Sequence, residues 1–341
     1  MKILIISPNP QFGGASTANR NIAAMLAKSG HEVVYADEFY KNPDENAGFQ
    51  TIGLPVYKNR LTKKYKTVRY IKENGFDTVI CGVSQMMAFY MFHLLYLRLF
   101  HKVQIGVIFH SLCVAKNFKG RIYEYMIALS TLVANHLFYV SAFTQVCWEK
   151  FCFVRWSGAK PHVIHNAVPD AEIKKIEADK PRIAFVGRLS AEKRPQLFCS
   201  YAQELSDSYD FVIWGDGPMS EELMKEHSSK VKFMGYESNA ERIYSNTDIL
   251  MMTSEFENCP MVILEARTYG VPVITVNVGG ISEILKDGYN GLFFSEDESP
   301  ASLKEKIENI ISHYAAYQKN CKDSAITLDK AAALWDKAVK E

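Results

Sequence analysis

The chain has 341 residues, which fits two domains of ordinary size. Hydrophobic residues make up 48% and charged residues 23%, a balance typical of a globular protein, so a disordered or fibrous chain is excluded. The net charge of +1 hides an asymmetry. Residues 1–165 hold 19 Lys and Arg against 9 Asp and Glu, whereas the remainder holds 20 against 29. The basic half is therefore expected to face an anionic partner, unless the split is a chance distribution of solvated charge.

Cysteines and apolar runs indicate a cytoplasmic protein. The seven cysteines are an odd number without a Cys-x-x-Cys pair, which argues against a disulfide framework or a structural zinc site. The apolar run at the N-terminus is too short for a signal peptide. Residues 86–97 fall short of the roughly 20 residues that span a bilayer, so they are predicted to form a core helix.

Strand-like and helix-like segments alternate along the first half. The strand-like runs are short, apolar and rich in β-branched residues, and longer amphipathic or apolar segments separate most of them: 2–7, 31–36, 76–81, 103–109 and 136–141. This alternation predicts parallel β-α-β winding.

A second round of alternation follows a charged segment at 169–181, which we interpret as an interdomain linker. Its strand-like runs are 182–187, 210–215, 232–235, 248–254, 272–276 and 291–294. The sequence therefore predicts an α/β fold of two Rossmann-like, doubly wound domains facing a cleft. We place the first domain at 1–166 and the second at 167–325, with a helix at about 326–341 that can pack back on the first.

Two cations follow the first strand of the second domain. The strand stops at Gly187, and Arg188 and Lys193 lie in the loop before the next helix. Cations at a strand's carboxyl end, close to a helix N-terminus, suit a diphosphate, although either alone would usually be a solvated surface charge. The Gly13-Gly14 pair after the first strand of the chain is a weaker anion signal, because such a pair is more often only a turn.

Two glutamates lie eight positions apart in "SEFENCPMVILEARTYGVPV". Pro260 suits the first turn of a helix and Gly270 its C-terminal cap. Glu257 then lies in the loop before the helix and Glu265 within it. Carboxylates accept hydrogen bonds from sugar hydroxyls, so one glutamate can hold a ribose and the other a pyranose.

The second domain resembles the nucleotide-sugar-binding half of the family-4 retaining glycosyltransferases of GT-B fold. The resemblance rests on "GRLSAEK", "WGDGP", "VKFMGY" and the long stretch from "SEFENCP" to "GLFF", and more thinly on "QFGGAS", "FHS" and "VIHNAV" in the first domain. It implies a retaining, metal-independent enzyme of hexosyltransferase type that needs no cofactor. Its donor would be a nucleotide-sugar, with UDP favoured and GDP possible, and its acceptor a growing glycan or a lipid-linked glycan of a cell-surface polysaccharide.

The resemblance also implies roles for individual residues. Arg188 and Lys193 would bind the diphosphate, Glu265 the ribose and Glu257 the donor sugar, with His110 beside the transferred sugar. The implied catalytic set is His110, Glu257, Arg188 and Lys193. The implied donor site comprises Gly13, Gly14, Arg188, Lys193, Gly215, Phe233, Gly235, Tyr236, Glu257, Asn258, Cys259, Pro260, Met261, Val262 and Glu265.

The chain departs from the family pattern at several positions. Asn258 and Cys259 stand where a Gly and an aromatic residue are usual, Arg194 replaces a Gly, and Ser111 stands where Asp is frequent. The charged site residues are all present. Because Asn258 and Cys259 border the implied sugar pocket, these departures bear on donor identity. His110 has the alternative role of an ordinary strand-end histidine.

Residues 58–72 contain seven Lys and Arg and no acid, with apolar residues at helical spacing. Such a helix can lie on an anionic cytoplasmic leaflet, which predicts a peripheral position on the inner face of the membrane; the alternative is a solvated charged face. No motif supports nucleic-acid binding. Two further alternatives are a GT-B epimerase acting on a UDP-sugar and a non-catalytic nucleotide-sugar-binding protein of the same fold.

Overall fold

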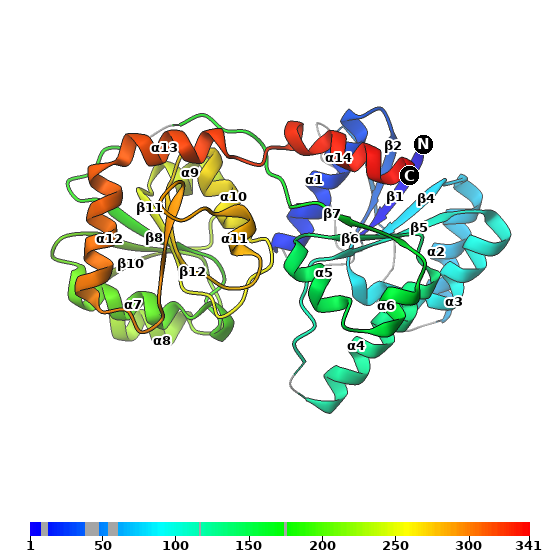
Figure 1. Ribbon diagram of the computed structural model, residues 1–341, viewed down its shortest axis with the longest axis horizontal. Coiled ribbons are helices and arrows are strands. Elements are labelled where there is room, and N and C mark those ends of the chain that lie inside the picture. The colour runs from blue at the N-terminus through cyan, green and yellow to red at the C-terminus, as the bar shows by residue number, and fades with distance from the viewer. Residues whose placement is uncertain (8–12, 38–47, 54–60, 116, 174–175) are drawn as a thin grey trace. The chain divides into compact units, whose positions relative to one another are not determined.

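The computed structural model describes residues 1–7, 13–37, 48–53, 61–115, 117–173 and 176–341, with 61–64 described in their backbone only. The chain divides into two compact units (Figure 1). Unit 1 is Met1–Ala167 together with Leu328–Glu341, and unit 2 is Val168–Thr327. Each has an open parallel sheet with helices packed on it, so the predicted α/β class of two doubly wound halves is confirmed.

Unit 1 is built on a parallel sheet in the order β3-β2-β1-β4-β5-β6-β7, seven strands among the described residues. The strands are β1 Lys2–Ile6, β2 Glu32–Ala36, β3 Gln50–Ile52, β4 Thr78–Cys81, β5 Gln104–Phe109, β6 His136–Tyr139 and β7 Lys160–Val163. The helices are α1 Gly14–Lys28, α2 Leu61–Asn74, α3 Ser84–His101, α4 Phe118–Ser130, η1 Thr131–Val133, α5 Ala142–Trp148, α6 Cys152–Trp156 and α14 Leu328–Lys340.

Unit 2 repeats the plan with the order β10-β9-β8-β11-β12-β13 over its described residues. Its strands are β8 Arg182–Val186, β9 Asp210–Trp214, β10 Val231–Gly235, β11 Ile249–Met252, β12 Val273–Val276 and β13 Gly291–Phe294. Its helices are η2 Ala191–Lys193, α7 Pro195–Leu205, α8 Ser220–His227, α9 Ala240–Ser245, α10 Met261–Thr268, α11 Ile281–Ile284, α12 Pro300–Ser312 and α13 Tyr314–Asp323.

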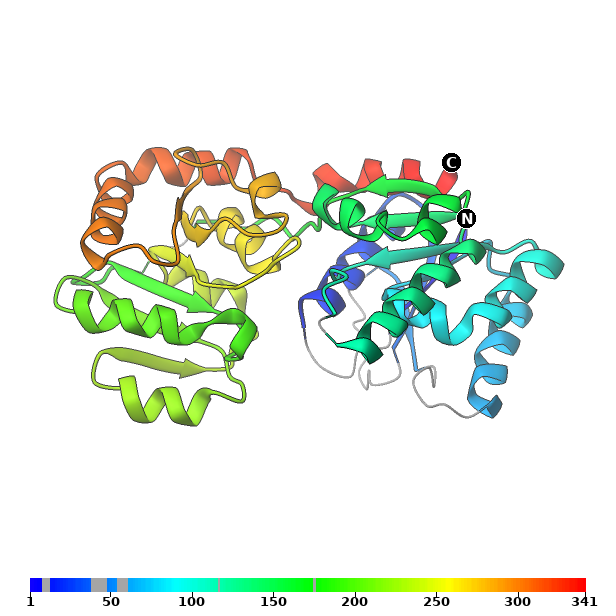
Figure 2. The same cartoon turned by 60° about the horizontal axis from the view of Figure 1, so that its bottom comes forward.

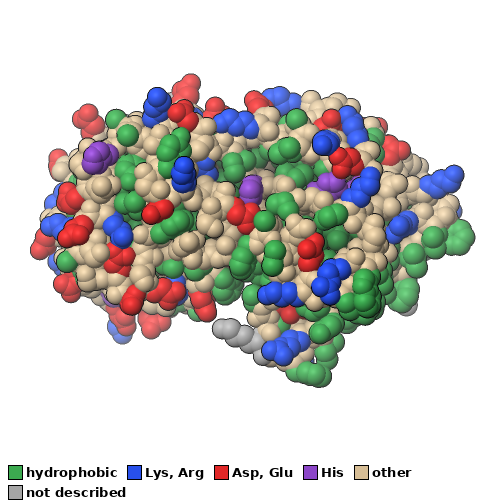
Figure 3. Space-filling view, viewed as in Figure 1, with side chains coloured by type: hydrophobic (Ala, Val, Ile, Leu, Met, Phe, Trp, Pro, Cys, Tyr) green, Lys and Arg blue, Asp and Glu red, His purple; other side chains and the backbone are tan. Residues whose placement is uncertain are grey.

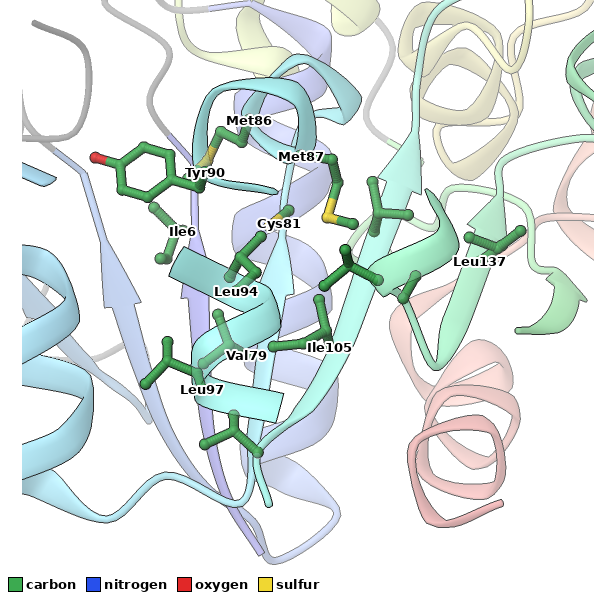
Figure 4. Packing of buried hydrophobic residues seen from close by; sticks show 14 of the residues in the cluster. Ile6, Val79, Cys81, Met86, Met87, Tyr90, Leu94, Leu97, Ile105 and Leu137 are labelled. Atoms are coloured by element: carbon green, nitrogen blue, oxygen red, sulfur yellow. The ribbon is translucent and has the colours of Figure 1, made fainter. Parts of the chain in front are cut away.

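The core of unit 1 lies between its central strands and the helices that cover them. Val79, Cys81 and Ile105 point from β4 and β5 toward Leu94 and Leu97 of α3 (Figure 4). All five are nearly or fully buried. Strands buried on both faces are apolar along their whole length, which is why these strands could be recognised in the sequence.

Two edge strands were not predicted. β3 has three residues and β7 is "KPHV", with Pro161 inside it. A proline cannot donate a ladder hydrogen bond and is tolerated in an edge strand, and a three-residue strand leaves almost no pattern. Both strands lie at the edges of the sheet, where fewer apolar residues are needed.

Helix α3 contains the predicted core segment 86–97, but only one of its sides is core. Met87, Leu94 and Leu97 are buried, whereas Phe92 is 76% exposed and Phe100 is 72% exposed. The prediction of a core helix was therefore wrong for the outer side, because an apolar composition all round a helix does not show how many of its sides are covered.

Helix α14 packs on unit 1 although it follows unit 2 in the chain. Both views show it, in red, alongside the sheet and α1 (Figure 1 and Figure 2). Trp335 is 2% exposed, and its ring lies 4.8 Å from that of Phe138 on β6. His31 Nε2 lies 2.8 Å from Asp336 Oδ1 and adds a polar contact.

Replacing Trp335 should destabilise unit 1. Trp335→Ala removes a large buried ring, which should lower the free energy of unfolding by about 3–5 kcal/mol. The neighbouring Leu334 is 56% exposed, so Leu334→Ala should cost no more than about 0.5 kcal/mol. Urea denaturation measures both, and hydrogen exchange of α1 and β6 assigns the loss to unit 1. Equal losses from the two variants would contradict this packing.

Candidate functional site

The strand order of unit 2 reverses at β8, which has β9 on one side and β11 on the other. The loops that follow two such neighbouring strands diverge and leave a crevice in which doubly wound sheets bind their ligands. Here these loops are 187–194 after β8 and 253–260 after β11. They contain the predicted Arg188, Lys193 and Glu257.

Hydrogen bonds join the two loops side by side. Thr253 Oγ1 donates to the carbonyl oxygens of Lys193 and Arg194, each at 2.9 Å. In return, Arg194 Nε donates to the Thr253 carbonyl at 2.7 Å and its Nη2 to the Ser254 carbonyl at 3.0 Å. The backbone on both sides of the crevice is thereby fixed.

Arg194 holds a left-handed conformation, with φ 49° and ψ 51°. A glycine adopts this region without steric cost, whereas other residues are disfavoured there. The side chain compensates through its bonds to the β11 loop and through an ion pair between Nη1 and Glu296 Oε2 at 2.5 Å. The departure from glycine at this position thus adds a clamp between the loops.

Lys193 and Glu257 form an ion pair across the crevice. Lys193 Nζ lies 2.5 Å from Glu257 Oε1, and Ser254 Oγ donates to the same oxygen at 2.9 Å. The Glu257 side chain is only 10% exposed, so its charge needs these partners. Arg188 is exposed and forms no ion pair with any residue that the structure describes. The crevice therefore contains one compensated cation and one open to a ligand.

The backbone of Gly279 and Gly280 lies against the backbone of Glu257. The Gly280 amide donates to the Glu257 carbonyl at 3.1 Å. Gly279 has φ 61°, and a Cβ atom there would lie 1.7 Å from that carbonyl oxygen. No larger residue fits without moving Glu257.

Glu265 lies on α10, the helix that follows the loop of Glu257. The Tyr244 hydroxyl lies 3.0 Å from Glu265 Oε2, to which it can donate, and 3.1 Å from the Val262 carbonyl. Burial raises the pKa of Glu265 to about 7, and the Tyr244 hydrogen bond opposes this rise only in part. The carboxyl group is therefore poised to change its charge near neutral pH.

The segment between Glu257 and Glu265 presents mainly backbone to a ligand. Cys259, Pro260 and Met261 are buried, and Asn258 and Val262 are half-buried. Pro260 is the N-cap of α10 and has extended backbone, so it lies just before the first turn in which the sequence placed it. The first amides of a helix have no intrahelical partner. These amides and the helix dipole favour an anion at this end.

Four further residues of the implied donor site lie on or directly after β10 and β9 of the same sheet. Phe233 and Gly235 lie on β10, and Tyr236 follows it with 63% of its surface exposed. Gly215 directly follows β9 and has φ 142°, and a Cβ atom there would lie 1.9 Å from the Gly187 carbonyl oxygen. The unit 2 residues of the predicted donor site therefore lie along the carboxyl ends of β10, β9, β8 and β11.

Gly13, Gly14 and His110 belong to unit 1. Gly13 is the N-cap of α1 and Gly14 its first residue. His110 directly follows β5, and its Nε2 lies 2.8 Å from Asn19 Oδ1. Burial lowers the pKa of His110 to about 4, so the ring is neutral near pH 7.

Asn19 fixes the tautomer of His110. Its Nδ2 donates to the Gly82 carbonyl at 2.8 Å, and a carbonyl only accepts, so Oδ1 must face His110. His110 Nε2 therefore bears the proton. Gly82 leaves room for this contact, because a Cβ atom there would lie 2.6 Å from Asn19 Nδ2. Asn19 is a positioning residue that the sequence did not reveal.

Among the described residues, no group of three or more His, Cys, Asp or Glu side chains is arranged to hold a metal ion.

Two family models match nearly the whole chain. "Glycosyltransferase Family 4" matches residues 12–172, and "Glycosyl transferases group 1" matches residues 169–327. The chain belongs to the family-4 glycosyltransferases of GT-B fold. The resemblance stated from the sequence motifs is thereby confirmed, as is the GT-B fold class.

A relative and two solved structures match most or all of the length of this glycosyltransferase. It is 26% identical over 327 residues to the O-antigen biosynthesis glycosyltransferase WbnH of Escherichia coli, covering 91% of this chain and 90% of that protein. The structure of Anabaena HepE in complex with UDP-glucose aligns with a TM-score of 0.79 at 15% identity, covering 100% and 99% of the two chains. An S. aureus TarM mutant in complex with fondaparinux, alpha-GlcNAc-glycerol and UDP aligns with a TM-score of 0.80 at 12% identity, covering both chains completely.

The pKa of Glu265 predicts how the stability of this glycosyltransferase depends on pH. The folded state holds the proton more tightly than the unfolded chain, so stability falls as pH rises from the ordinary glutamate pKa to about 7. Glu265→Gln removes this loss and keeps an oxygen for Tyr244. The stabilising effect of this substitution on the ligand-free protein should therefore be about 3 kcal/mol larger at pH 8 than at pH 4.5, since the pKa rises from 4.5 to about 7 and one pKa unit is about 1.4 kcal/mol.

Hydrogen exchange of peptides from unit 2, measured at both pH values, tests this difference. Glu305→Gln, at an exposed position of α12, is the matched control and should give no such pH dependence. A pH-independent effect of Glu265→Gln would show that its carboxyl group is not perturbed.

Proposed function

We propose that this glycosyltransferase transfers a sugar, with retention and without a metal ion, from a nucleotide diphosphate donor to a glycan or lipid-linked acceptor. The favoured donor is a UDP-sugar, with a GDP-sugar as the second possibility. The product would belong to a cell-surface polysaccharide.

The observation that supports this proposal most strongly is the charge arrangement at the reversal point of unit 2. Arg188 is open, Lys193 is paired with Glu257, and the two loops are fixed by hydrogen bonds. A nucleotide diphosphate sugar offers what both partners of the pair need: phosphate oxygens for Lys193 and sugar hydroxyls for Glu257. Donor binding would thus exchange the ion pair for two sets of charged hydrogen bonds, which are stronger than neutral ones.

The same cations can act in the reaction. Cleavage of the anomeric C–O bond leaves negative charge on the diphosphate, and Arg188, Lys193 and the first amides of α10 would stabilise that charge. In the proposed mechanism the acceptor hydroxyl attacks on the face that the leaving group vacates, and a departing phosphate oxygen takes its proton. The neutral ring of His110 can hydrogen-bond the sugar without adding charge.

The relatives support the choice of donor and product class. HepE holds UDP-glucose and the TarM mutant holds UDP in their structures, and WbnH is named for O-antigen biosynthesis. Glu265, a carboxyl group that can accept from a ribose, lies beside the loop of Glu257.

Removing the positive charge of Lys193 should weaken donor binding. Lys193→Ala should reduce UDP affinity about 10- to 100-fold, since a hydrogen bond to a charged group is worth about 1.5–3 kcal/mol. Lys230→Ala is the control, because Lys230 pairs with Asp207 at the amino end of β10, away from the crevice. Isothermal titration calorimetry measures the affinity of both variants for UDP and GDP. The same titrations of the parent protein show which base the site prefers. Unchanged UDP affinity in Lys193→Ala would refute the diphosphate site.

Transfer itself is tested with a UDP-sugar panel and a polyprenyl diphosphate-linked glycan acceptor. Transfer that continues in EDTA and gives a product with the donor's anomeric configuration supports the proposal. Loss in EDTA with recovery in Mn²⁺ would contradict metal independence. Conversion of the donor to an epimer without acceptor would establish the epimerase alternative instead.

We also propose that unit 1 binds the inner, anionic face of a membrane. No helix in the described part of the chain combines the length and apolarity of a membrane span. From the predicted basic segment 58–72, residues 58–60 lie outside the described residues. Lys66, Arg69 and Lys72 are exposed on α2, where Arg69 pairs with Glu73.

An exposed apolar face beside this segment supports membrane binding. It comprises Phe89, Phe92, Tyr96, Leu99 and Phe100 of α3 and Phe118, Ile122, Tyr125, Met126 and Leu129 of α4, all between 37% and 78% exposed. The rings of Phe89 and Tyr123 lie 6.1 Å apart and join the two helices. Hydrophobic side chains gather at the lower right of the space-filling view, where α4 lies in Figure 1 (Figure 3).

The charges around this apolar face suit an anionic bilayer. Between residues 84 and 133 the sequence has five Lys and Arg and only one acid, Glu124, whose Oε1 accepts from the Ala115 amide. Lys102, Lys119 and Arg121 are exposed. Aromatic side chains that enter the headgroup region, with cations around them, are typical of proteins that lie on a membrane.

Polar substitutions on the apolar face should release the protein from lipid. The triple variant Phe92→Ser, Phe100→Ser, Phe118→Ser should bind liposomes containing phosphatidylglycerol at least tenfold more weakly in flotation assays, because three large apolar side chains no longer enter the bilayer. The control is Met224→Ser with Leu334→Ser, two exposed apolar positions on α8 and α14, outside the apolar face.

Binding of the parent protein should also fall with rising NaCl, because the attraction of the cations is screened. Undiminished flotation of the triple variant would contradict the proposal. If the parent protein dimerises through this face and does not bind liposomes, the face serves self-association instead.

A further inference from the structure

Cys113 and Cys147 meet in the folded chain although 34 residues separate them. Their sulfur atoms lie 2.6 Å apart, and Cys113 Sγ also lies 2.8 Å from the Cys147 carbonyl oxygen. Both are free thiols. A disulfide bond is about 2.05 Å long, so the two sulfurs need to move by roughly half an ångström to bond.

The surrounding contacts hold both cysteines in place. Cys147 lies on α5, whose N-cap Ser141 accepts from the Thr144 amide at 3.0 Å. The next residue, Trp148, is 1% exposed, and its Nε1 donates to the Ser111 carbonyl at 2.8 Å. The loop that carries Cys113 is thus tied to α5 by a hydrogen bond as well as by the sulfur contact.

We propose that Cys113 and Cys147 are a reversible oxidative modification site, at which a hydroperoxide converts the two thiols to a disulfide. One thiolate attacks the peroxide oxygen and becomes a sulfenic acid, releasing water or an alcohol. The second thiol then attacks that sulfur, forms the S–S bond and releases water. In sum, two thiols and one hydroperoxide give one disulfide, one water and one water or alcohol, so the two sulfurs are oxidised and the O–O bond is reduced.

Two features favour this reaction at this pair. The hydrogen bond between the thiols lowers the pKa of Cys147 to about 6, which supplies a thiolate near neutral pH. Cys113 is half-buried rather than buried, so an oxidant can reach the pair from the side of the 110–115 loop. Cys321, by contrast, donates to the carbonyl oxygens of Val271 and Asn290.

The bond would stiffen the segment that positions His110. Cys113 lies three residues after His110, and Ser111 between them is already tied to Trp148. A disulfide would add a covalent link between this loop and α5. This consequence concerns the site of the proposed function, but bond formation itself does not depend on sugar transfer.

The experiment oxidises the intact protein with hydrogen peroxide under native conditions and then alkylates the remaining thiols. The expected result is a loss of 2 Da, two fewer alkylated cysteines, and a cross-linked peptide pair containing Cys113 and Cys147, all reversed by dithiothreitol. Hydrogen exchange of residues 110–115 should slow at least tenfold in the oxidised form.

Variants decide whether this pair is responsible. Cys113→Ser and Cys147→Ser should each abolish the 2 Da loss, whereas Cys152→Ser, a half-buried cysteine of α6, should leave it unchanged. The proposal is overturned if the parent protein yields no such disulfide while still folded, or if Cys113→Ser still forms an intramolecular disulfide. Because mass and thiol counts are read without a sugar donor, either result leaves the proposed transferase function intact.

Discussion

The arrangement of unit 2 depends on the contact between two loops that begin on neighbouring strands. β8 and β11 pair in the sheet although their last residues, Val186 and Met252, are 66 positions apart in the sequence, and the chain leaves their carboxyl ends side by side. Only this adjacency brings Lys193 within 2.5 Å of Glu257. A half-buried lysine and a nearly buried carboxylate each lose hydration, and their mutual pairing offsets that loss in the absence of a ligand.

The charges of Lys193 and Glu257 also determine which ligands can take the place of their ion pair. A simple anion satisfies Lys193 but leaves Glu257 without a cation, and a neutral sugar satisfies Glu257 but leaves Lys193 alone. A molecule with phosphate and hydroxyl groups joined in one structure satisfies both at once. In the proposed function, the ion pair would therefore select for nucleotide-linked sugars over either part alone, and the open Arg188 would provide a first attachment for the phosphate.

Arg194 shows how a departure from the family pattern is accommodated. The left-handed conformation costs an ordinary residue about 1–2 kcal/mol relative to glycine. The Arg194 side chain offsets this cost by donating two hydrogen bonds to backbone carbonyls and forming one ion pair. The carbonyls of Thr253 and Ser254 lie just before Glu257 in the chain, so the arginine fixes the very loop that presents the carboxylate. A glycine would adopt the turn readily but leave that loop less restrained.

The sequence predicted the parts of this protein that depend on local pattern and missed those that depend on distant contacts. Buried parallel strands are continuous apolar runs, so β1, β5 and β8 were readily recognised, whereas the edge strand β7 contains Pro161 and lacks such a run. Lys193 and Glu257 were assigned to one ligand, but their ion pair was not foreseen. Asn19 and Tyr244 were missed because each looks like an ordinary helix residue until His110 or Glu265, 91 and 21 positions away, is placed beside it.

For the outer side of α3, the apolar composition was recognised in the sequence, but the predicted burial of that side was wrong. A helix with apolar residues on every side can be surrounded by protein or can meet an apolar phase, and sequence alone does not distinguish the two. Burying apolar surface is worth about 25 cal/mol per Å². A chain that leaves Phe92, Phe100 and Phe118 each more than 70% exposed forgoes that gain on three large side chains. Basic residues around the same helices, with almost no acid, then favour an anionic lipid surface as the phase that recovers the gain. The proposed membrane contact would also account for the positive charge balance of the first half of the sequence.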